Sequence, residues 1–467
     1  MMKKWVRFFT VFLLIAAMAV GYAGPCFSAD DEAPDIDAKA AILMDADSGN
    51  VLYALNEDTP LFTAGLSVMM TALLAAEAEE RGDVAYDDVV VASAASHSDV
   101  TEDASIQNIV PGEEMSLEDL LACILIGGAS EACNIVAEHV GGSIGDFVKK
   151  MNARAAELGC TGTNFVNAHG LPADRNYSTA YDMALIASQF VKHDKLIELA
   201  NTVAKTIPAT NVSGERSLTS TNYILRQDYT RYYYSYACGI KSSYTEDAGF
   251  CLASSMKADG SYVVSIVLGC RILESDNGFY DVQSFIQTRR LFQWFNSRYS
   301  LRDVISTIEP ITEIPVQLAE GTDTVVCCSL EGLRLFLPTE LNIKDTYKRV
   351  ITIYSQEPGA EPLTAPVTRG QVLGELRVTD GKGGTYGPFP LVANTDVAVS
   401  RVELMRRRLG DLVKGKWFRT IFWIVVAVIA LYAILVIRYR ILRMKERRAR
   451  RKARRRELEA ERDESRR

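Results

Sequence analysis

Serine, histidine and aspartate occur together in the run Ser-His-Ser-Asp at residues 96–99, and these are the residue types of a nucleophilic triad. A triad assembles from residues that lie apart in the sequence, since adjacent side chains cannot all converge on one substrate atom. We therefore interpret residues 96–99 as a solvated loop. No two histidines have the spacing of metal ligands, so we expect neither a metal nor a cofactor. The other three histidines are His139, His169 and His193.

Cysteine is the other residue type that could do chemistry here. The chain has nine cysteines, and eight remain if a leader ending at Ala29 is removed. They lie mostly in apolar stretches, and none has the short spacing of a metal site. We expect buried free thiols that pack as small hydrophobic groups. Disulfides remain an alternative if the compartment is oxidising.

The N-terminal segment has the pattern of an export signal. Lys3, Lys4 and Arg7 precede an uncharged run that starts at Phe8. A positive start, an apolar run and small residues before the end are typical of a secretory signal peptide, which we place at residues 1–29. The alternative is an uncleaved N-terminal anchor.

A second apolar segment lies near the C-terminus. Thr420 to Ile437 contains no charged residue, and about 20 apolar residues suffice to cross a bilayer. From Arg438 onward, fifteen Lys or Arg face six Asp or Glu. Positive residues beside a span stay on the cytoplasmic side. The sequence thus predicts a single-pass cell-membrane protein with a transmembrane helix at 417–438, a cytoplasmic tail at 439–467 and the remainder outside.

The charges are divided unequally along the chain. The segment from Arg438 onward carries a net +9 while the whole chain carries −8, so everything before Arg438 carries −17. Such an acidic remainder argues against nucleic acid as a partner. The basic tail is expected to lie against anionic lipid or to be solvated.

The exported part alternates between helical and strand patterns. A hairpin is predicted for residues 41–53, and a second hairpin turns at Asp259-Gly260 between strands 249–256 and 261–268. Thr- and Val-rich alternation suggests a small β domain at 306–400, which a juxtamembrane linker at 401–416 follows. Helices are predicted at residues 65–81, 116–126, 131–139, 144–158 and 282–299.

Several short motifs punctuate this order of elements. Most of these motifs lie between Met151 and residue 184, and they include Asn167-Ala-His169-Gly170-Leu171 and the segment 177–184. Another motif, Gly239-Ile-Lys241, follows later. With the opening segment 41–53, they cover roughly residues 38–270. The chain resembles the serine D-alanyl-D-alanine carboxypeptidases, the low-molecular-weight penicillin-binding proteins.

The resemblance implies an α/β (α+β) fold for residues 30–305. This fold is an antiparallel sheet flanked by helices, with a helical subdomain. It also implies three catalytic motifs, S-x-x-K, an S-x-N type and K-T-G. The serine attacks the peptide carbonyl, the lysine one turn later takes its proton, and the K-T-G strand binds the substrate carboxylate and aligns its peptide.

This sequence departs from all three motifs. Gly65 and Val68 occupy the positions of the nucleophile and its base, and Gly128-Ala129-Ser130 replaces Ser-x-Asn. Glycine has no atom that can attack, and valine cannot accept a proton. Losing one member of such a unit can cost on the order of a million-fold in rate, and further losses add little.

Other residues are weak substitutes at the site. Ser67 is expected to face away from the site, about 200° around a helix from Gly65. Ser130 has no evident base. At the K-T-G position the chain has Lys241-Ser242-Ser243, so only the lysine of that motif is kept. We predict that these three residues still bind substrate. We expect His169 to stabilise a turn.

Three functions remain open at this level. The leading hypothesis is an inactive relative that binds peptidoglycan stem peptide or a cell-wall synthesis protein. The first alternative is an active carboxypeptidase that uses an unrecognised serine. The second is an interaction platform that acts through the basic tail.

Overall fold

The computed structural model describes residues 33–464, apart from residues 103, 275–277, 279 and 382. The signal peptide predicted for residues 1–29 lies outside the described residues. The chain divides into two compact units. One holds the chain up to Val304 together with Leu333–Tyr347, and the other holds Ile305–Gly332 and everything from Lys348 onward. The boundaries predicted at 305 and 400 stay predictions.

A five-stranded antiparallel sheet forms the centre of the first unit. The sheet confirms both predicted hairpins, and its strand order is β2-β1-β9-β8-β7. Asp259 and Gly260 both have positive φ at the turn between β8 and β9, as a tight two-residue hairpin requires. The strands are β1 (Ala40–Asp45), β2 (Val51–Leu55), β7 (Ala237–Thr245), β8 (Gly249–Ala258) and β9 (Ser261–Cys270).

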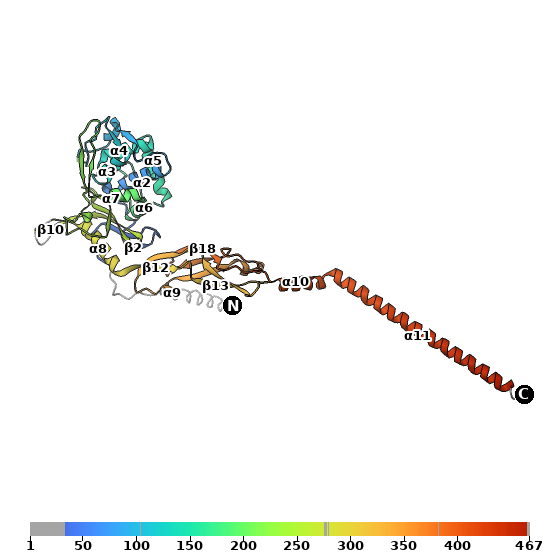
Figure 1. The fold of residues 1–467 in the computed structure, drawn as a ribbon. Helices are drawn as coiled ribbons and strands as arrows, with labels where there is room; N and C mark the ends of the chain where they lie inside the picture. The colour runs from blue at the N-terminus through green and yellow to red at the C-terminus, as the bar shows by residue number, and fades with distance from the viewer. Residues whose placement is uncertain (1–32, 103, 275–277, 279, 382, 465–467) are drawn as a thin grey trace, which may run out of the picture. The chain divides into compact units, whose positions relative to one another are not determined.

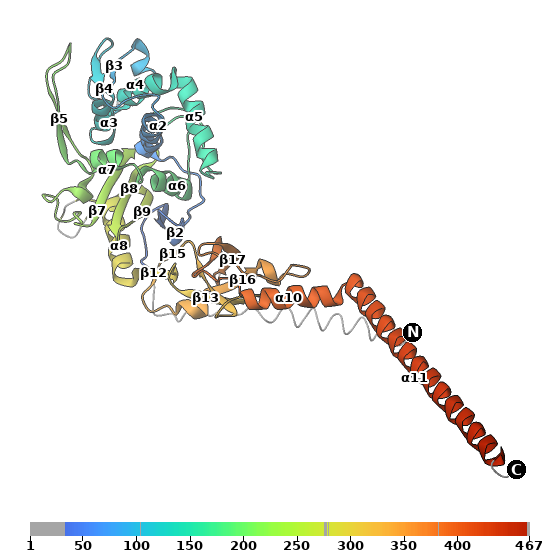
Figure 2. The same cartoon turned by 45° about the vertical axis from the view of Figure 1, so that its right-hand side comes forward.

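Helices cover both faces of this sheet (Figures 1 and 2). Alternate residues of β1 point to opposite faces. Ile42 belongs to the larger core, with the helices α2 to α7, whereas Leu43 belongs to a smaller core, with α8. The helices of the larger core are α2 (Val68–Glu80), α3 (Leu117–Leu125), α4 (Ser130–Gly141), α5 (Ile144–Glu157), α6 (Ala180–Phe190) and α7 (Asp194–Asn201). The smaller core is covered by α8 (Gln283–Arg298).

Three helices of the first unit start at a side-chain cap, namely the predicted α3 and α5 and the unpredicted α6. Ser116, Ser143 and Thr179 each accept a hydrogen bond from the backbone N–H three residues later, at 3.1, 3.1 and 3.0 Å. Such caps satisfy donors that the first helical turn leaves unpaired. One prediction needs correction, because α2 begins at Val68 and a 3₁₀ turn, η1 (Ala64–Ser67), precedes it.

Three small two-stranded sheets complete the first unit. They are β3 (Val89–Val91) with β4 (Glu114–Ser116), β5 (Ala204–Ile207) with β6 (Arg216–Thr219), and β10 (Ile272–Glu274) with β11 (Tyr280–Val282). In addition, β12 (Tyr299–Ile305) pairs with β15 (Leu333–Pro338). This pairing explains why residues 333–347 belong to the first unit.

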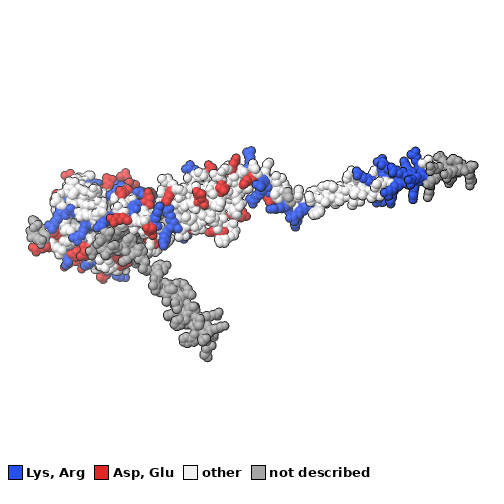
Figure 3. All heavy atoms as spheres, turned by 90° about the horizontal axis from the view of Figure 1, so that it is seen from below, with Lys and Arg blue, Asp and Glu red and all other residues white. Residues whose placement is uncertain are grey.

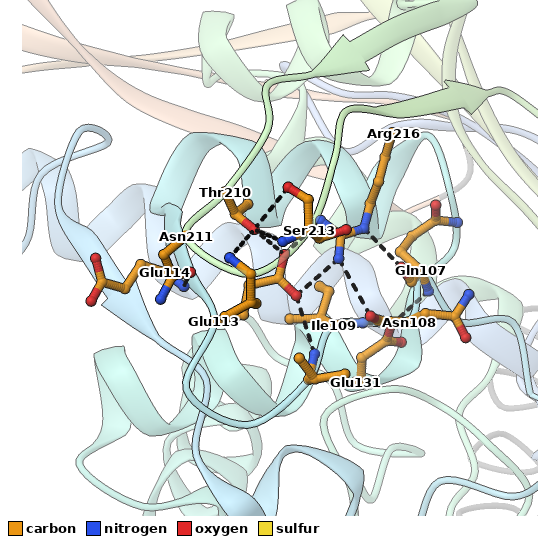
Figure 4. A network of polar contacts seen from close by, with 12 residues as sticks. Gln107, Asn108, Ile109, Glu113, Glu114, Glu131, Thr210, Asn211, Ser213 and Arg216 are labelled. Carbon is orange, nitrogen blue, oxygen red and sulfur yellow. Dashed lines mark hydrogen bonds and ion pairs between the residues drawn. The ribbon is translucent and has the colours of Figure 1, made fainter.

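A buried ion pair ties the β5–β6 hairpin to the loop that precedes β4 (Figure 4). Glu113 is fully buried, and its carboxylate lies 2.6 Å from Nη1 of Arg216. The carboxylate also accepts hydrogen bonds from Thr210 Oγ1 and from the backbone N–H of Val110. Burial alone would raise the pKa of Glu113, but these hydrogen bonds and the Arg216 charge lower it. Every oxygen of this carboxylate therefore has a donor.

The second unit contains another five-stranded antiparallel sheet, in the order β13-β14-β18-β17-β16. Its presence confirms the predicted β fold of this region. The strands are β13 (Pro310–Pro315), β14 (Thr324–Ser329), β16 (Lys348–Ile353), β17 (Val372–Thr379) and β18 (Thr385–Ala393).

Two helices end the chain. Most of the predicted linker at 401–416 is helical, since it contains α10 (Arg401–Lys414), whose first turn Ser400 caps. The next helix, α11 (Lys416–Glu464), contains the apolar segment and is the one helix among the described residues that is long and apolar enough to cross a membrane. Lys and Arg gather along α11 after its apolar part (Figure 3).

Candidate functional site

Gly65 lies in η1, facing the edge strand β7. Its backbone N–H donates a hydrogen bond of 2.8 Å to Ser243 Oγ, 178 residues later in the chain. A Cβ added at Gly65 would lie 2.8 Å from the same oxygen, closer than real Cβ contacts. The Ser243 hydroxyl therefore fills the space beside the nucleophile position and also engages its backbone donor.

Gly128 approaches β7 from the connection between α3 and α4. Its φ is 71°, a conformation that side-chain-bearing residues rarely adopt. A Cβ at this position would lie 3.3 Å from Lys241 Nζ and 3.4 Å from Ser105 Oγ. The connection thus passes directly beside the lysine.

The structure brings four of the predicted positions together at one place, namely Gly65, Gly128, Lys241 and Ser243. The remaining three lie around it. Val68 and Ser130 are buried as the first residues of α2 and α4, and Ser242 shares a 3.0 Å hydrogen bond with Thr221.

Lys241 is a buried cation, with 5% of its surface exposed. Burial lowers its pKa to about 8, against a small opposing effect of Cys133. Within the described part of the chain, no hydrogen bond or ion pair reaches its Nζ. A buried charge without a partner is costly, so the site favours an anion that would supply one.

The turn at residues 167–171 packs against η1. His169 Nδ1 accepts a hydrogen bond from Leu171 N at 3.2 Å, and Asn167 Oδ1 accepts one from Gly170 N at 2.8 Å. Burial lowers the pKa of His169 to about 4, which keeps the ring neutral. The predicted turn-stabilising role of His169 is therefore confirmed.

Ser67 packs against this same turn. A Cβ at Gly170 would overlap Ser67 Oγ and the carbonyl of Ala64, so glycine is required there. Ser67 is buried, and its Oγ has no hydrogen-bond partner among the described residues. Because η1 is a 3₁₀ turn, the 200° argument from α-helical geometry does not apply to Ser67, and its expected orientation away from the site stays a prediction.

The run at residues 96–99 departs from its interpretation as a solvated loop. Its first half belongs to a 3₁₀ turn, and Ser96 is fully buried with its Oγ 3.0 Å from His97 Nδ1. Asn134 donates to the carbonyl oxygens of Ser96 and Ser98. The segment is exposed only from His97 to Asp99, and its contacts with α4 are structural.

The cysteines follow the preferred interpretation. Among the described residues eight cysteines are free thiols, and seven of these are buried. Burial raises the pKa of Cys123 and Cys160 to about 12 and that of Cys251 to about 11. Such thiols stay protonated and unreactive near neutral pH.

Comparisons with known proteins identify the family. The family described as D-alanyl-D-alanine carboxypeptidase, Peptidase_S11, matches residues 28–271. The carboxypeptidase DacF of Bacillus subtilis is 27% identical over 86% of this chain and 98% of its own length. DacA of Escherichia coli is 30% identical over 78% of this chain and 84% of its own length.

Solved structures show the same fold. Penicillin-binding protein 5 of Haemophilus influenzae aligns with a TM-score of 0.61 and 24% identity, covering 79% of this chain and 99% of its own. A peptidoglycan synthesis regulatory factor, PBP3 of Streptococcus pneumoniae, aligns with a TM-score of 0.60 and 25% identity, covering 78% and 100%. The chain belongs to the serine D-alanyl-D-alanine carboxypeptidase family of low-molecular-weight penicillin-binding proteins.

Proposed function

We propose that this family member has lost acyl transfer and binds peptidoglycan stem peptide at the outer surface of the cell membrane. One observation carries the proposal. The residue at the nucleophile position has no side-chain oxygen, and its backbone N–H is already donated to Ser243 Oγ.

That backbone donor matters as much as the missing hydroxyl. Acyl transfer needs donors that are free to stabilise the oxyanion as it forms, and removing one such donor costs roughly 100- to 1000-fold in rate. At Gly65 the donor already has an acceptor within the protein. Nucleophile, base and one oxyanion donor are therefore all missing from the same place.

The site still has two features that peptide binding requires, a buried cation and an edge strand. Lys241 is buried and forms no ion pair with the described residues, so a terminal carboxylate would neutralise it. The strand that carries Lys241 is β7, the edge of the sheet. An edge strand offers its unpaired backbone groups to an extended peptide, which adds to the sheet as a further strand.

The two apolar segments support the proposed location. The signal peptide predicted at residues 1–29 and the basic residues that follow the apolar part of α11 favour an orientation with the two folded units outside the membrane. The basic end of α11 then lies in the cytoplasm.

A labelling experiment tests the loss of chemistry. Purified full-length protein in detergent is incubated with a fluorescent penicillin, with DacA of Escherichia coli as the positive control. We expect no covalent label on this chain. A label located by mass spectrometry on any residue of the site would overturn the proposal.

A restoration experiment sharpens the same point. The double variant Gly65→Ser, Val68→Lys returns the nucleophile and its base, yet we expect it to stay unlabelled. A serine Cβ at position 65 meets Ser243 Oγ at 2.8 Å, and Gly128 and Ser130 still lack the second motif. Labelling of the double variant would show that the rest of the site has remained competent.

Binding is measured separately. Fluorescence anisotropy with a labelled peptide ending in D-Ala-D-Ala is expected to show saturable binding that Lys241→Met weakens. A peptide with the same sequence but a C-terminal amide is the matched control, because it lacks the carboxylate. Equal binding of acid and amide would remove Lys241 from its assigned role.

A further inference from the structure

A pocket of about 350 Å³ lies in the first unit, at the end of β7 that follows Ser243. Four separate segments contribute to it, and none of its residues belongs to the three degenerate motifs. The lining residues are Lys39, Pro60, Leu61, Phe62, Arg175, Tyr177, Asp247 and Ala248.

The walls of this pocket continue the two segments that form the site. Residues 60–62 run directly into η1 and Gly65, and Asp247 follows the last residue of β7, Thr245, by two positions. Leu61 exchanges backbone hydrogen bonds of 2.8 and 3.0 Å with Ser178, which attaches the Arg175–Tyr177 wall to the same frame. A ligand that lies along β7 past Ser243 therefore reaches the pocket.

The charges in the pocket leave a positive surplus. Lys39 and Arg175 face a single acid, Asp247, and among the described residues no hydrogen bond or ion pair involves any of these three side chains. The Lys39 stem is held in place, since it packs where a Cβ of Gly269 would otherwise lie. Phe62 and Tyr177 are each 39% exposed and supply apolar walls.

The proposed function fixes the direction of a peptide in the site. Its terminal carboxylate lies at Lys241 and its last peptide bond beside Ser243, so the rest of the peptide runs toward Thr245. At about 3.3 Å per residue, the third residue from the C-terminus lies opposite the end of β7. Its side chain is then within reach of the turn that carries Asp247.

We propose, on the basis of that function, that this pocket selects stem peptides whose third residue from the C-terminus carries a carboxylate. Lys39 and Arg175 supply the attraction, and the stem packing of Lys39 reduces the conformational entropy lost on binding. Asp247 opposes the carboxylate and limits the affinity. The preference is electrostatic at a partly exposed site, so it is modest and sensitive to salt.

The test uses two probes that differ by one group. Fluorescein-Gly-L-Glu-D-Ala-D-Ala and its L-Gln counterpart are titrated into the full-length protein in detergent. We expect the acidic peptide to bind about three- to tenfold more tightly at low salt, with the preference falling as salt is added.

Three variants assign the preference to the pocket. Lys39→Met combined with Arg175→Met should abolish it, and methionine keeps the packing of the Lys39 stem on Gly269. Asp247→Asn should increase it, because a repelling charge is removed. The matched control is Lys149→Met combined with Arg81→Met, which removes two exposed cations outside the pocket and should leave the preference unchanged.

The outcomes separate this inference from the proposed function. Equal affinity of the two peptides for the wild-type protein overturns the pocket assignment and leaves peptide binding intact. Weaker binding of the acidic peptide to Asp247→Asn also overturns it, since Asp247 would then not be repelling the added carboxylate. If neither peptide binds, both the proposed function and the pocket assignment fail.

Discussion

Two buried charges in the first unit are treated in opposite ways. Glu113 is enclosed by Arg216, Thr210 and the backbone of Val110, which together satisfy its carboxylate (Figure 4). Lys241 is buried almost as deeply, yet within the described residues nothing pairs with it. The first arrangement fastens a hairpin to the fold, whereas the second leaves an unmet demand for an anion. A charge that the protein leaves unsatisfied identifies a binding site better than one that it neutralises.

The largest effect should come from breaking the satisfied pair. Glu113→Ala leaves the Arg216 guanidinium, 11% exposed, without its partner, and we expect it to lower the free energy of unfolding by about 3–5 kcal/mol. Thermal or denaturant unfolding of the full-length protein in detergent measures this. The double variant Glu113→Met, Arg216→Met should recover most of the loss, and a single variant near wild-type stability would show that the pair contributes little.

Removing the unsatisfied charge should act in the opposite direction. Lys241→Met deletes a buried group without a recorded partner, so we expect the free energy of unfolding at pH 7 to rise by about 1–3 kcal/mol. Binding of a peptide with a free terminal carboxylate should fall tenfold or more. A loss of stability like that of Glu113→Ala would mean that Lys241 does have a partner, and the contrast between the two charges would disappear.

The same contrast predicts a pH dependence. The pKa of Lys241 is about 8 in the folded protein, below its ordinary value near 10.5, so between these values the unfolded chain binds more protons. The Lys241 contribution to stability is therefore unfavourable below pH 8 and is relieved as pH rises from 8 to 10.5. The free energy of unfolding is measured against pH for the wild type and for Lys241→Met, and the difference between the two curves isolates this contribution. Peptide affinity should fall over the same range as the lysine loses its charge.

The smallest effect should come from an exposed pair. Arg81 and Asp83 lie 2.9 Å apart with side chains 56% and 60% exposed. Water already solvates both groups, so Asp83→Ala should change the free energy of unfolding by less than about 1 kcal/mol. The same unfolding assay measures it. A change as large as that of Glu113→Ala would show that burial is not what separates these charges.

Much of the fold was predictable because local signals agree with it. The Asp259-Gly260 turn and the caps at Ser116 and Ser143 mark boundaries in the sequence itself. The β5–β6 hairpin, α6 and α7 were not predicted. The helix α10 was missed because three consecutive arginines, 406–408, obscure an apolar stripe whose members are Val402, Met405, Leu409 and Leu412.

The site was predictable only through the family resemblance, which places Gly65, Gly128 and Lys241 at motif positions. The hydrogen bond from Gly65 to Ser243 could not be predicted from the sequence, because it joins residues 178 positions apart and forms only when η1 packs against β7. The charges of the neighbouring pocket come from three segments with no shared motif. Properties that arise from long-range convergence need the folded chain.

The helix α11 continues without interruption from its apolar part into its basic part. At 1.5 Å per residue, the stretch from Arg438 to Arg455 extends about 27 Å along the axis. Salt screens lipid charge within roughly 8–10 Å. If the rod remains straight, its outer arginines lie too far from the headgroups to be held by them, and they become available to acidic molecules that approach from solution.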